Sequence, residues 1–355
     1  MWLSPGVAVH AAATLALAAL GGFAAHLVGI PLAWMIGAMI AVAAAGVASA
    51  RPAAPTELRP AALIVLGTGF GQAFTQPVLA ALAESLPALV LAGFASVLSG
   101  LVVSRVTARA SGLDSRTAFF LSVPGGIVAM VVLAARAGAS VPAVTLGQTL
   151  RMVLVVLAYP MAMAVFGTPG QDVFSFTPPP VSWQRLPVLF ALTVAGAFLL
   201  SHTGLANPWM MGPVSVSLAL ALAGMPLSGL PAALVDAAQV AMGASLGARL
   251  TREFLFRSRP LLVASVVNML LLSAFATAIA LACVALAQLP LQATLLGTAP
   301  GGMPEMAITA KVMNLGVPLV LGFHLVRLLI CNLFVPPLWR AYSWAERTLG
   351  LSAGE

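Results

Sequence analysis

An apolar run in the second half of the chain is interrupted at residues 299–306, which read Ala-Pro-Gly-Gly-Met-Pro-Glu-Met. This segment cannot continue an ordinary helix, because proline lacks a backbone donor and glycine adds conformational freedom. In hydrocarbon, a broken backbone is tolerated only where protein buries it or where it lines a watery cavity. A similar segment, Val-Pro-Gly-Gly-Ile-Val-Ala-Met, occupies residues 123–130, an offset of 176 residues (300 − 124 = 176). We interpret the two breaks as halves of one internal site.

The composition sets the solvent in which the chain folds. Of the 355 residues, 61% are hydrophobic and only 7% are charged, and the mean hydropathy is +1.06. Such a chain has too few charged side chains to cover a soluble domain, so we predict an all-α polytopic membrane protein in a lipid bilayer. The net charge of +7 is explained by arginines in short loops, which orient membrane proteins. We expect no nucleic acid as partner.

The chain contains an internal duplication. Its apolar segments, about twelve by hydropathy, form two sets of six that align at the 176-residue offset. The duplication predicts a first membrane repeat at 1–167, a polar Pro-rich connector at 168–184, a second membrane repeat at 185–345 and a cytoplasmic tail at 346–355. Matched residues include Gly67 with Gly243, Gly71 with Gly247, Pro124 with Pro300, Arg151 with Arg327, and Pro160 with Pro336.

The distribution of arginine predicts the orientation of the two repeats. In the first repeat, arginines occupy the loops 50–60 and 104–116, whereas the expected loop around Glu84, between segments 60–82 and 86–104, has none. In the second repeat the pattern is reversed, and the loop that matches Glu84 is rich in arginine. Because cytoplasmic loops collect arginine, the two repeats are expected to have opposite orientations.

Opposite orientations require an odd number of crossings in each repeat. One of the six segments must then fail to cross, and the segment with the Pro-Gly-Gly break is our candidate, as a re-entrant hairpin. A broken helix that does cross is the alternative. The predicted fold is two inverted-topology repeats with about 10 transmembrane helices plus two re-entrant or broken helices. With hairpins, both termini lie in the cytoplasm.

Inverted repeats with broken helices are the plan of many secondary transporters, whose binding site lies where the breaks meet. A helix that starts inside the membrane directs free N–H groups and a positive dipole end into this site, which favours an anion. Glycines allow a ligand to approach the backbone closely. The candidate binding residues at the breaks are Pro124, Gly125, Gly126, Pro300, Gly301 and Gly302.

Glu305 is the one carboxylate within either break. A carboxylate inside a membrane is costly, so it is a candidate to carry a coupling proton or to help bind a cation. The structural alternative is that Glu305 holds the hairpin together or pairs with Lys311. Lys311 is the only lysine in the chain, and it either marks the membrane edge or lies beside the site.

Arg151 and Arg327 occupy matching places in the segments that follow the breaks. Two buried arginines are suited to bind carboxylate or phosphate oxygens. The alternative is that each neutralises backbone carbonyls at a helix break, or that one pairs with Glu305. His324, with Gln148 as its counterpart, lies three residues before Arg327 and is either a proton shuttle or a hydrogen-bonded core residue.

Small residues recur at i and i+4 around Thr68 and Ser245, which favours close helix packing, although their hydroxyls are further candidates to contact a substrate. The four histidines are scattered without ligand spacing, and no nucleophile elbow or Walker-type loop occurs. We therefore expect no enzyme activity, no metal and no cofactor.

The Pro-Leu-Ala-Trp-Met-Ile-Gly-Ala segment at 31–38 and the core motif at 299–306 resemble the AbrB family of bacterial membrane proteins. The resemblance extends over nearly the whole chain, but Val128-Ala129 replace the Pro304-Glu305 of the second core. Family members carry labels such as ammonia monooxygenase or transcriptional regulator. The family is similar at fold level to cation/proton antiporters and bile-acid symporters, which adds weight to transport only by analogy.

Three hypotheses follow. The first is a secondary active transporter of a small anionic solute, coupled to H⁺ or Na⁺, in the bacterial cytoplasmic (inner) membrane. The second is a membrane sensor or regulatory protein that affects gene expression indirectly. The third is the membrane monooxygenase of the family label, although the histidines do not cluster as metal ligands. The sequence leaves a homodimer open.

Overall fold

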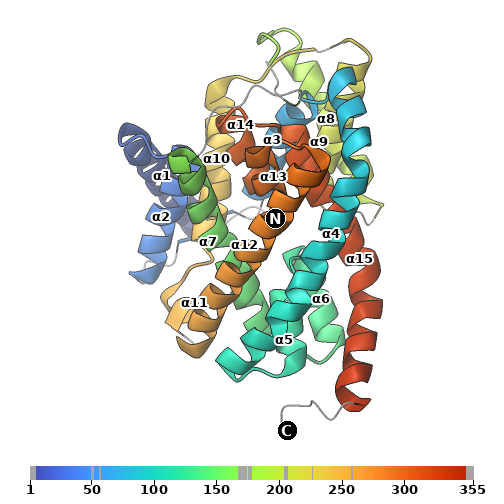
Figure 1. The fold of residues 1–355 in the computed structure, drawn as a ribbon. Helices are drawn as coiled ribbons and strands as arrows, with labels where there is room; N and C mark the ends of the chain where they lie inside the picture. Colours follow the sequence, from blue (N-terminus) through green and yellow to red (C-terminus); the bar gives the residue numbers. More distant parts are fainter. Residues whose placement is uncertain are drawn as a thin grey trace. The chain divides into compact units, whose positions relative to one another are not determined.

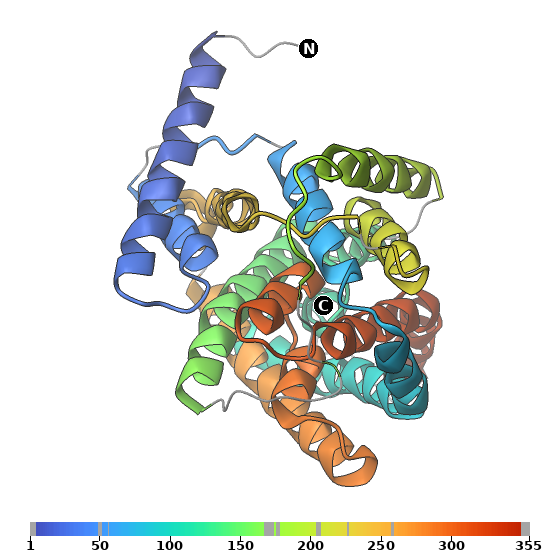
Figure 2. The same ribbon diagram turned by 90° about the horizontal axis from the view of Figure 1, so that it is seen from above.

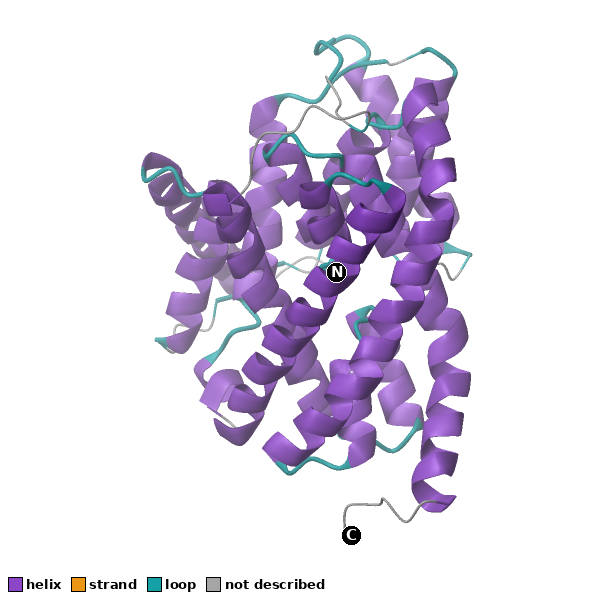
Figure 3. Ribbon diagram, viewed as in Figure 1, coloured by secondary structure: helices purple, strands orange, loops and turns teal. Residues whose placement is uncertain are grey.

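The computed structural model describes residues 5–48, 52–55, 57–166, 174, 178–203, 207–225, 227–256 and 259–348. Helices are the only regular elements in these ranges, as Figures 1 and 3 show. In chain order they are α1 Pro5–Leu27, α2 Ala33–Val47, α3 Leu58–Gly71, α4 Gln76–Ser111, α5 Ser115–Ser122, α6 Ile127–Arg136, α7 Val141–Phe166, α8 Leu186–Ser201, α9 Pro208–Leu222, α10 Ala232–Gly247, α11 Arg252–Phe256, α12 Arg259–Ala287, α13 Leu291–Thr298, α14 Met303–Val312 and α15 Val317–Thr348.

The helices are those of a multi-pass membrane protein. Within the described ranges, five helices are long and apolar enough to cross a membrane, namely α1, α4, α7, α12 and α15. Five shorter apolar helices accompany them, which are α2, α3, α8, α9 and α10. The remaining short helices include α5, α6, α13 and α14, which flank the two Pro-Gly-Gly breaks. The all-α polytopic fold predicted from hydropathy is confirmed.

The chain folds into two compact units that interleave along the sequence. Unit 1 consists of Met1–Ala81, Pro160–Arg257 and Ala307–Pro318, and the rest of the chain forms unit 2. Each unit therefore takes helices from both sequence repeats. Only Phe174 and residues 178–184 of the 168–184 connector are described, and of the 346–355 tail only residues 346–348.

Unit 1 contains α1, α2 and α3 from the first repeat and α8, α9, α10 and α11 from the second, and helices pack across the repeats. The helix α2 packs against α1 and α10, and α3 packs against α9 (Figure 2). A Cβ at Gly67 on α3 would collide with the carbonyl oxygen of Met210 on α9, and one at Gly243 on α10 would collide with that of Met35 on α2. The equivalent glycines thus allow equivalent close contacts, which confirms the predicted helix packing.

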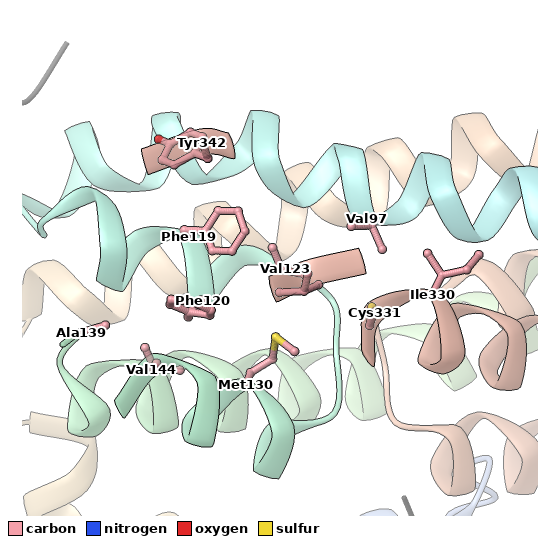
Figure 4. Packing of buried hydrophobic residues seen from close by; sticks show 12 residues of the cluster. Val97, Phe119, Phe120, Val123, Met130, Ala139, Val144, Ile330, Cys331 and Tyr342 are labelled. Carbon is pink, nitrogen blue, oxygen red and sulfur yellow. The ribbon is translucent and has the colours of Figure 1, made fainter. Parts of the chain in front are cut away.

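Unit 2 repeats one motif twice, in which a long helix leads to a short helix, the break, a second short helix and another long helix. The first copy runs from α4 to α7 and the second from α12 to α15. Figure 1 shows that α4 and α12 run in opposite directions. An apolar cluster joins the first hairpin to α15 and includes Phe119 and Met130 of the hairpin and Ile330 and Tyr342 of α15, with the ring of Phe119 close to that of Tyr342 (Figure 4).

The backbone records the duplication independently of side chains. Positive φ angles occur at Gly112 (66°) and at its equivalent Gln288 (54°), both located between a long helix and a short one. They also occur at Gly138 (73°) and its equivalent Asn314 (52°). Side chains disfavour this left-handed region. The shared conformation therefore reflects a turn that the fold requires in both repeats.

The first break lies within a hairpin of two short helices. The backbone N–H of Ser140, which follows α6, donates to Oγ1 of Thr117 in the first turn of α5 over 2.9 Å. The start of α5 and the end of α6 are thus adjacent, so the chain reverses direction at the break. Of the two alternatives left open by the sequence, the first break adopts the hairpin.

One predicted loop is wrong. The segment expected at 60–82 ends as a helix at Gly71, and α4 begins at Gln76 and continues for 36 residues through Glu84 and Pro87. Pro77 lies in the first turn of α4, where the missing N–H of proline has no cost. Glu84 is therefore an exposed residue on a helix and does not mark a loop.

Candidate functional site

The first break leaves backbone carbonyls without helical partners, and α7 supplies donors to them. The helix α5 ends at Ser122 and α6 begins at Ile127. Nε2 of Gln148 donates to the carbonyl oxygens of Phe120 (2.8 Å), Leu121 (3.2 Å) and Val123 (3.1 Å). The guanidinium of Arg151 donates to Val123 O from Nη1 (3.3 Å) and to Gly125 O from Nη2 (3.5 Å). These side chains take the place of the missing helical bonds.

The second break is held by α15 in the same way, but with shorter bonds. Nη1 of Arg327 donates to Ala299 O over 2.6 Å and Nη2 donates to Gly301 O over 3.0 Å. His324 lies between the carbonyl oxygen of Leu296 and the guanidinium of Arg327. Its Nε2 is 3.2 Å from Leu296 O, and its Nδ1 is 2.8 Å from Nη2 of Arg327.

The two sets of bonds are equivalent at the 176-residue offset. The donors Gln148 and Arg151 correspond to His324 and Arg327. The acceptors Phe120, Val123 and Gly125 correspond to Leu296, Ala299 and Gly301. Both arginines are therefore bound to break carbonyls, which is one of the two roles that the sequence left open. We call each set a clamp, meaning the residue pair 148/151 or 324/327 with its carbonyls.

Each clamp helix also touches the opposite break. A Cβ at Gly301 in the second break would lie 2.9 Å from Cγ1 of Val155 on α7. The thiol of Cys331 on α15, the counterpart of Val155, is 3.8 Å from Pro124 O in the first break. From its N-terminus to its C-terminus, α7 thus passes from the first break to the second, whereas α15 passes from the second break to the first. Equivalent helices run in opposite directions, as expected of inverted repeats.

The site contains two buried cations. Arg151 is 3% exposed and Arg327 is 7% exposed, and their positive charges repel each other. Nε of Arg151 and Oε1 of Gln148 are buried and have no hydrogen-bond partner. The first clamp therefore retains an unused donor and an unused acceptor, which is costly for buried polar atoms.

Glu305 is fully buried in the first turn of α14. Its Oε2 lies so close to Gly302 that a Cβ on that glycine would collide with it. The N–H of Met306 donates to Gly302 O over 3.1 Å, so Gly302 precedes the first helical residue. Glu305 is thus the third helical residue, at the end of α14 where the helix dipole is positive.

The remaining candidates from the sequence lie in unit 1. Thr68 is buried on α3 and its hydroxyl donates to Ile64 O over 2.7 Å, so the helix already uses it. Ser245 is half-buried on α10. Lys311 is half-buried on α14, with Nζ over Gly69 of α3, where a Cβ would lie 2.6 Å away. The clamps and breaks are assembled from unit 2 residues alone.

Two features of unit 2 were not predicted from the sequence. Gln148 was recognised only as the counterpart of His324, although that equivalence was the available signal for its role. Asn268 on α12 donates to Ser122 Oγ over 2.6 Å and to Thr107 Oγ1 over 2.9 Å, and all three residues are buried. Nothing in the sequence pattern pairs these residues. Within the described ranges, no group of three or more His, Cys, Asp or Glu is placed to hold a metal ion.

Comparisons with known proteins place this arrangement in a family. A relative from Bacillus subtilis (strain 168), "Uncharacterized protein YhjN", is 28% identical over 356 residues, with 92% of this chain and 91% of the relative covered. "Putative regulator AbrB" from Escherichia coli (strain K12) is 27% identical over 334 residues, with 92% and 94% covered. No solved structure matches the chain.

The family model described as "Transition state regulatory protein AbrB" matches residues 34–343. This range includes both breaks, both clamps and most of each unit. The chain therefore belongs to the AbrB family.

Proposed function

We propose that the protein is a secondary active transporter of a small anionic solute, coupled to H⁺ or Na⁺, with its binding site between the two Pro-Gly-Gly breaks. The observation that carries the proposal is that α7 and α15 each hold one break and touch the other. Two helix starts, those of α6 and α14, are thereby brought to one pair of helices. Paired breaks of this kind are the usual binding site of inverted-repeat transporters.

An anionic solute fits the charges of this site. The two helix starts present free N–H groups and positive dipole ends. The two buried guanidinium groups oppose each other, so an anion near them would relieve the repulsion. Nε of Arg151 is a buried donor that the protein does not use, and a bound oxygen would satisfy it. These features together favour a carboxylate or phosphate group over a cation.

Glu305 is the proposed coupling carboxylate. It is the acidic residue in the first turn of α14, beside the break at Gly302. A group that gains and loses a proton or Na⁺ at this place would change the charge of the binding site during the transport cycle. We place the protein in the bacterial inner membrane with both termini in the cytoplasm, following the arginine distribution.

A regulatory function is the second candidate, because the Escherichia coli relative is named as a regulator. A sensor would use the same site without net transport. We do not propose an enzyme, since the site offers clamps and helix starts in place of a catalytic group. Metal analysis of the purified protein tests the monooxygenase label, because an oxygenase of this kind would retain iron or copper.

The test is substrate-dependent flux in proteoliposomes. A thermal-shift screen of small organic anions and phosphate first identifies a ligand, since binding to the folded state raises its stability. The ligand should accumulate against its gradient when a proton or Na⁺ gradient is imposed. The control Arg136→Gln removes an exposed arginine at the end of α6 and should transport normally. Ligand binding without accumulation would refute transport and favour the sensor.

A further inference from the structure

The surroundings of His324 fix its protonation state. A guanidinium group carries only donors, so the ring nitrogen that lies 2.8 Å from Nη2 of Arg327 must be an unprotonated acceptor. A carbonyl oxygen is only an acceptor, so the other nitrogen, 3.2 Å from Leu296 O, must carry the proton. The imidazole in the second clamp is therefore neutral, with its proton on Nε2.

Protonation of Nδ1 is incompatible with this arrangement. It would replace the hydrogen bond with two N–H groups that face each other, and would bring two positive charges together without water to screen them. Because the same Nη2 also donates to Gly301 O over 3.0 Å, a shift of Arg327 would release that carbonyl. Gly301 precedes Gly302 and the first turn of α14, which contains Glu305.

We propose that His324 is a proton-controlled positioning residue, which holds Arg327 on the second break when neutral and releases Arg327 when protonated. The second break is then firm at neutral pH and loosened in acid. The release frees the carbonyls of Ala299 and Gly301 together, because Nη1 and Nη2 belong to one rigid guanidinium group.

Other titratable groups lie around the clamp. The thiol of Cys331 on α15 interacts electrostatically with Arg327, and so does the hydroxyl of Tyr159 on α7. Arg151 on α7 adds a second positive charge near Arg327. Glu305 lies in the first turn after the break, on α14, against Gly302. A proton on His324 would thus add a third positive charge to those of the two guanidinium groups.

The first clamp lacks this control. Gln148 occupies the position of His324 and donates to Phe120 O, the equivalent of Leu296 O, over 2.8 Å. An amide does not titrate in the physiological range. Acidification should consequently loosen one break and leave the other unchanged, which gives the inverted repeats different pH responses. A link between this asymmetry and ion coupling rests on the proposed transport function, whereas the clamp itself does not.

The test uses the full-length protein in detergent micelles without a solute. Hydrogen–deuterium exchange, corrected for intrinsic rates, is compared between about pH 8 and about pH 5, which bracket the usual histidine pKa of about 6.5. Peptides covering 299–306 should lose protection about thirtyfold on acidification, since each pH unit below the pKa of the released histidine corresponds to about a factor of ten and about pH 5 lies roughly 1.5 units below it. Peptides covering 123–130 are the internal control and should not change.

Two variants, in which each clamp receives the residue of the other, complete the test. His324→Gln copies the first clamp and should remove the acid sensitivity of the second break. Gln148→His copies the second clamp and should make the first break acid-sensitive. Equal pH responses of the two breaks in the wild-type protein would overturn the proposal, as would unchanged acid sensitivity in a folded His324→Gln protein. If the breaks respond as expected but no solute is transported, the proposed function fails and the proton-controlled clamp stands.

Discussion

The thiol of Cys331 lies 3.8 Å from the carbonyl oxygen of Pro124, so α15 contacts the first break one turn after Arg327 has closed the second. The equivalent contact of α7 is apolar and joins Val155 to Gly301. A displacement of either helix would therefore change contacts at both breaks. This connection gives the paired breaks a physical means of acting together.

Arg327 should matter more for stability than its counterpart Arg151. Replacing Arg327 with Gln loses bonds of 2.6 and 3.0 Å and leaves buried carbonyls unsatisfied. The cost is roughly 3 kcal/mol of unfolding free energy, at about 1–3 kcal/mol for each orphaned group. Arg151→Gln loses longer bonds of 3.3 and 3.5 Å, so its cost should be smaller, whereas the relief of the repulsion between the two arginines is common to both variants. Thermal unfolding in detergent measures both, and the reverse order would contradict the bond lengths.

Asn268 should be a stability residue of unit 2. Asn268→Ala removes two buried hydrogen bonds, to Ser122 and Thr107, at a cost of about 2 kcal/mol. The control on the same helix is Thr277→Ala, which removes only an exposed bond to Ser273 O and should change the melting temperature little. If both variants melt alike, the buried Asn268 cluster contributes nothing measurable.

Close helix packing in unit 1 predicts that Gly243→Ala is destabilising, although alanine favours helices. The added methyl collides with the backbone oxygen of Met35, which cannot move without displacing α2, and overpacking of this kind costs about 1–3 kcal/mol. Gly126→Ala is the control, because its Cβ meets only Leu328, at an ordinary 3.5 Å. A lower melting temperature is expected for Gly243→Ala alone.

Glu305→Gln tests the coupling proposal. Glutamine keeps the size and the hydrogen-bonding capacity of the side chain at the start of α14, but it cannot carry a proton or bind a cation by charge. We expect ion-driven accumulation to be abolished in proteoliposomes while solute binding persists in the thermal-shift assay. Wild-type accumulation with wild-type pH dependence would make Glu305 a structural residue.

The orientation of the repeats predicts which loops share a membrane side. Single cysteines at Ser111 and Ser258, in a background without Cys283 and Cys331, should react with an impermeant reagent from the same side. Ser111 ends α4, and Ser258, which lies outside the described residues, precedes α12. Labelling from opposite sides would be incompatible with inverted repeats.

The duplication and both breaks could be predicted from the sequence because proline and glycine leave a local signature. The clamps were only half predictable. The matched positions of Arg151 and Arg327 are visible in the sequence, but their acceptors are backbone atoms 26–29 residues away, which no pattern of side chains reveals.

The predicted loop at Glu84 failed for a different reason. A single carboxylate in an apolar stretch was interpreted as a chain reversal, yet α4 carries it on an exposed surface. The helix also continues past Pro87, because proline inside a helix is unusual in water but tolerated in membrane helices. The Asn268 cluster joins residues that are 146 and 161 positions apart, and only tertiary packing brings them together.

The interleaved course of the chain determines when each unit can fold during synthesis. Unit 1 needs Ala307–Pro318 and unit 2 needs the residues from Leu319 onward, so neither can close until the ribosome has made most of the protein. Domains built from one continuous segment can fold in order as they emerge. Here the early helices remain without their later partners until then, which is a point where insertase or chaperone assistance would act.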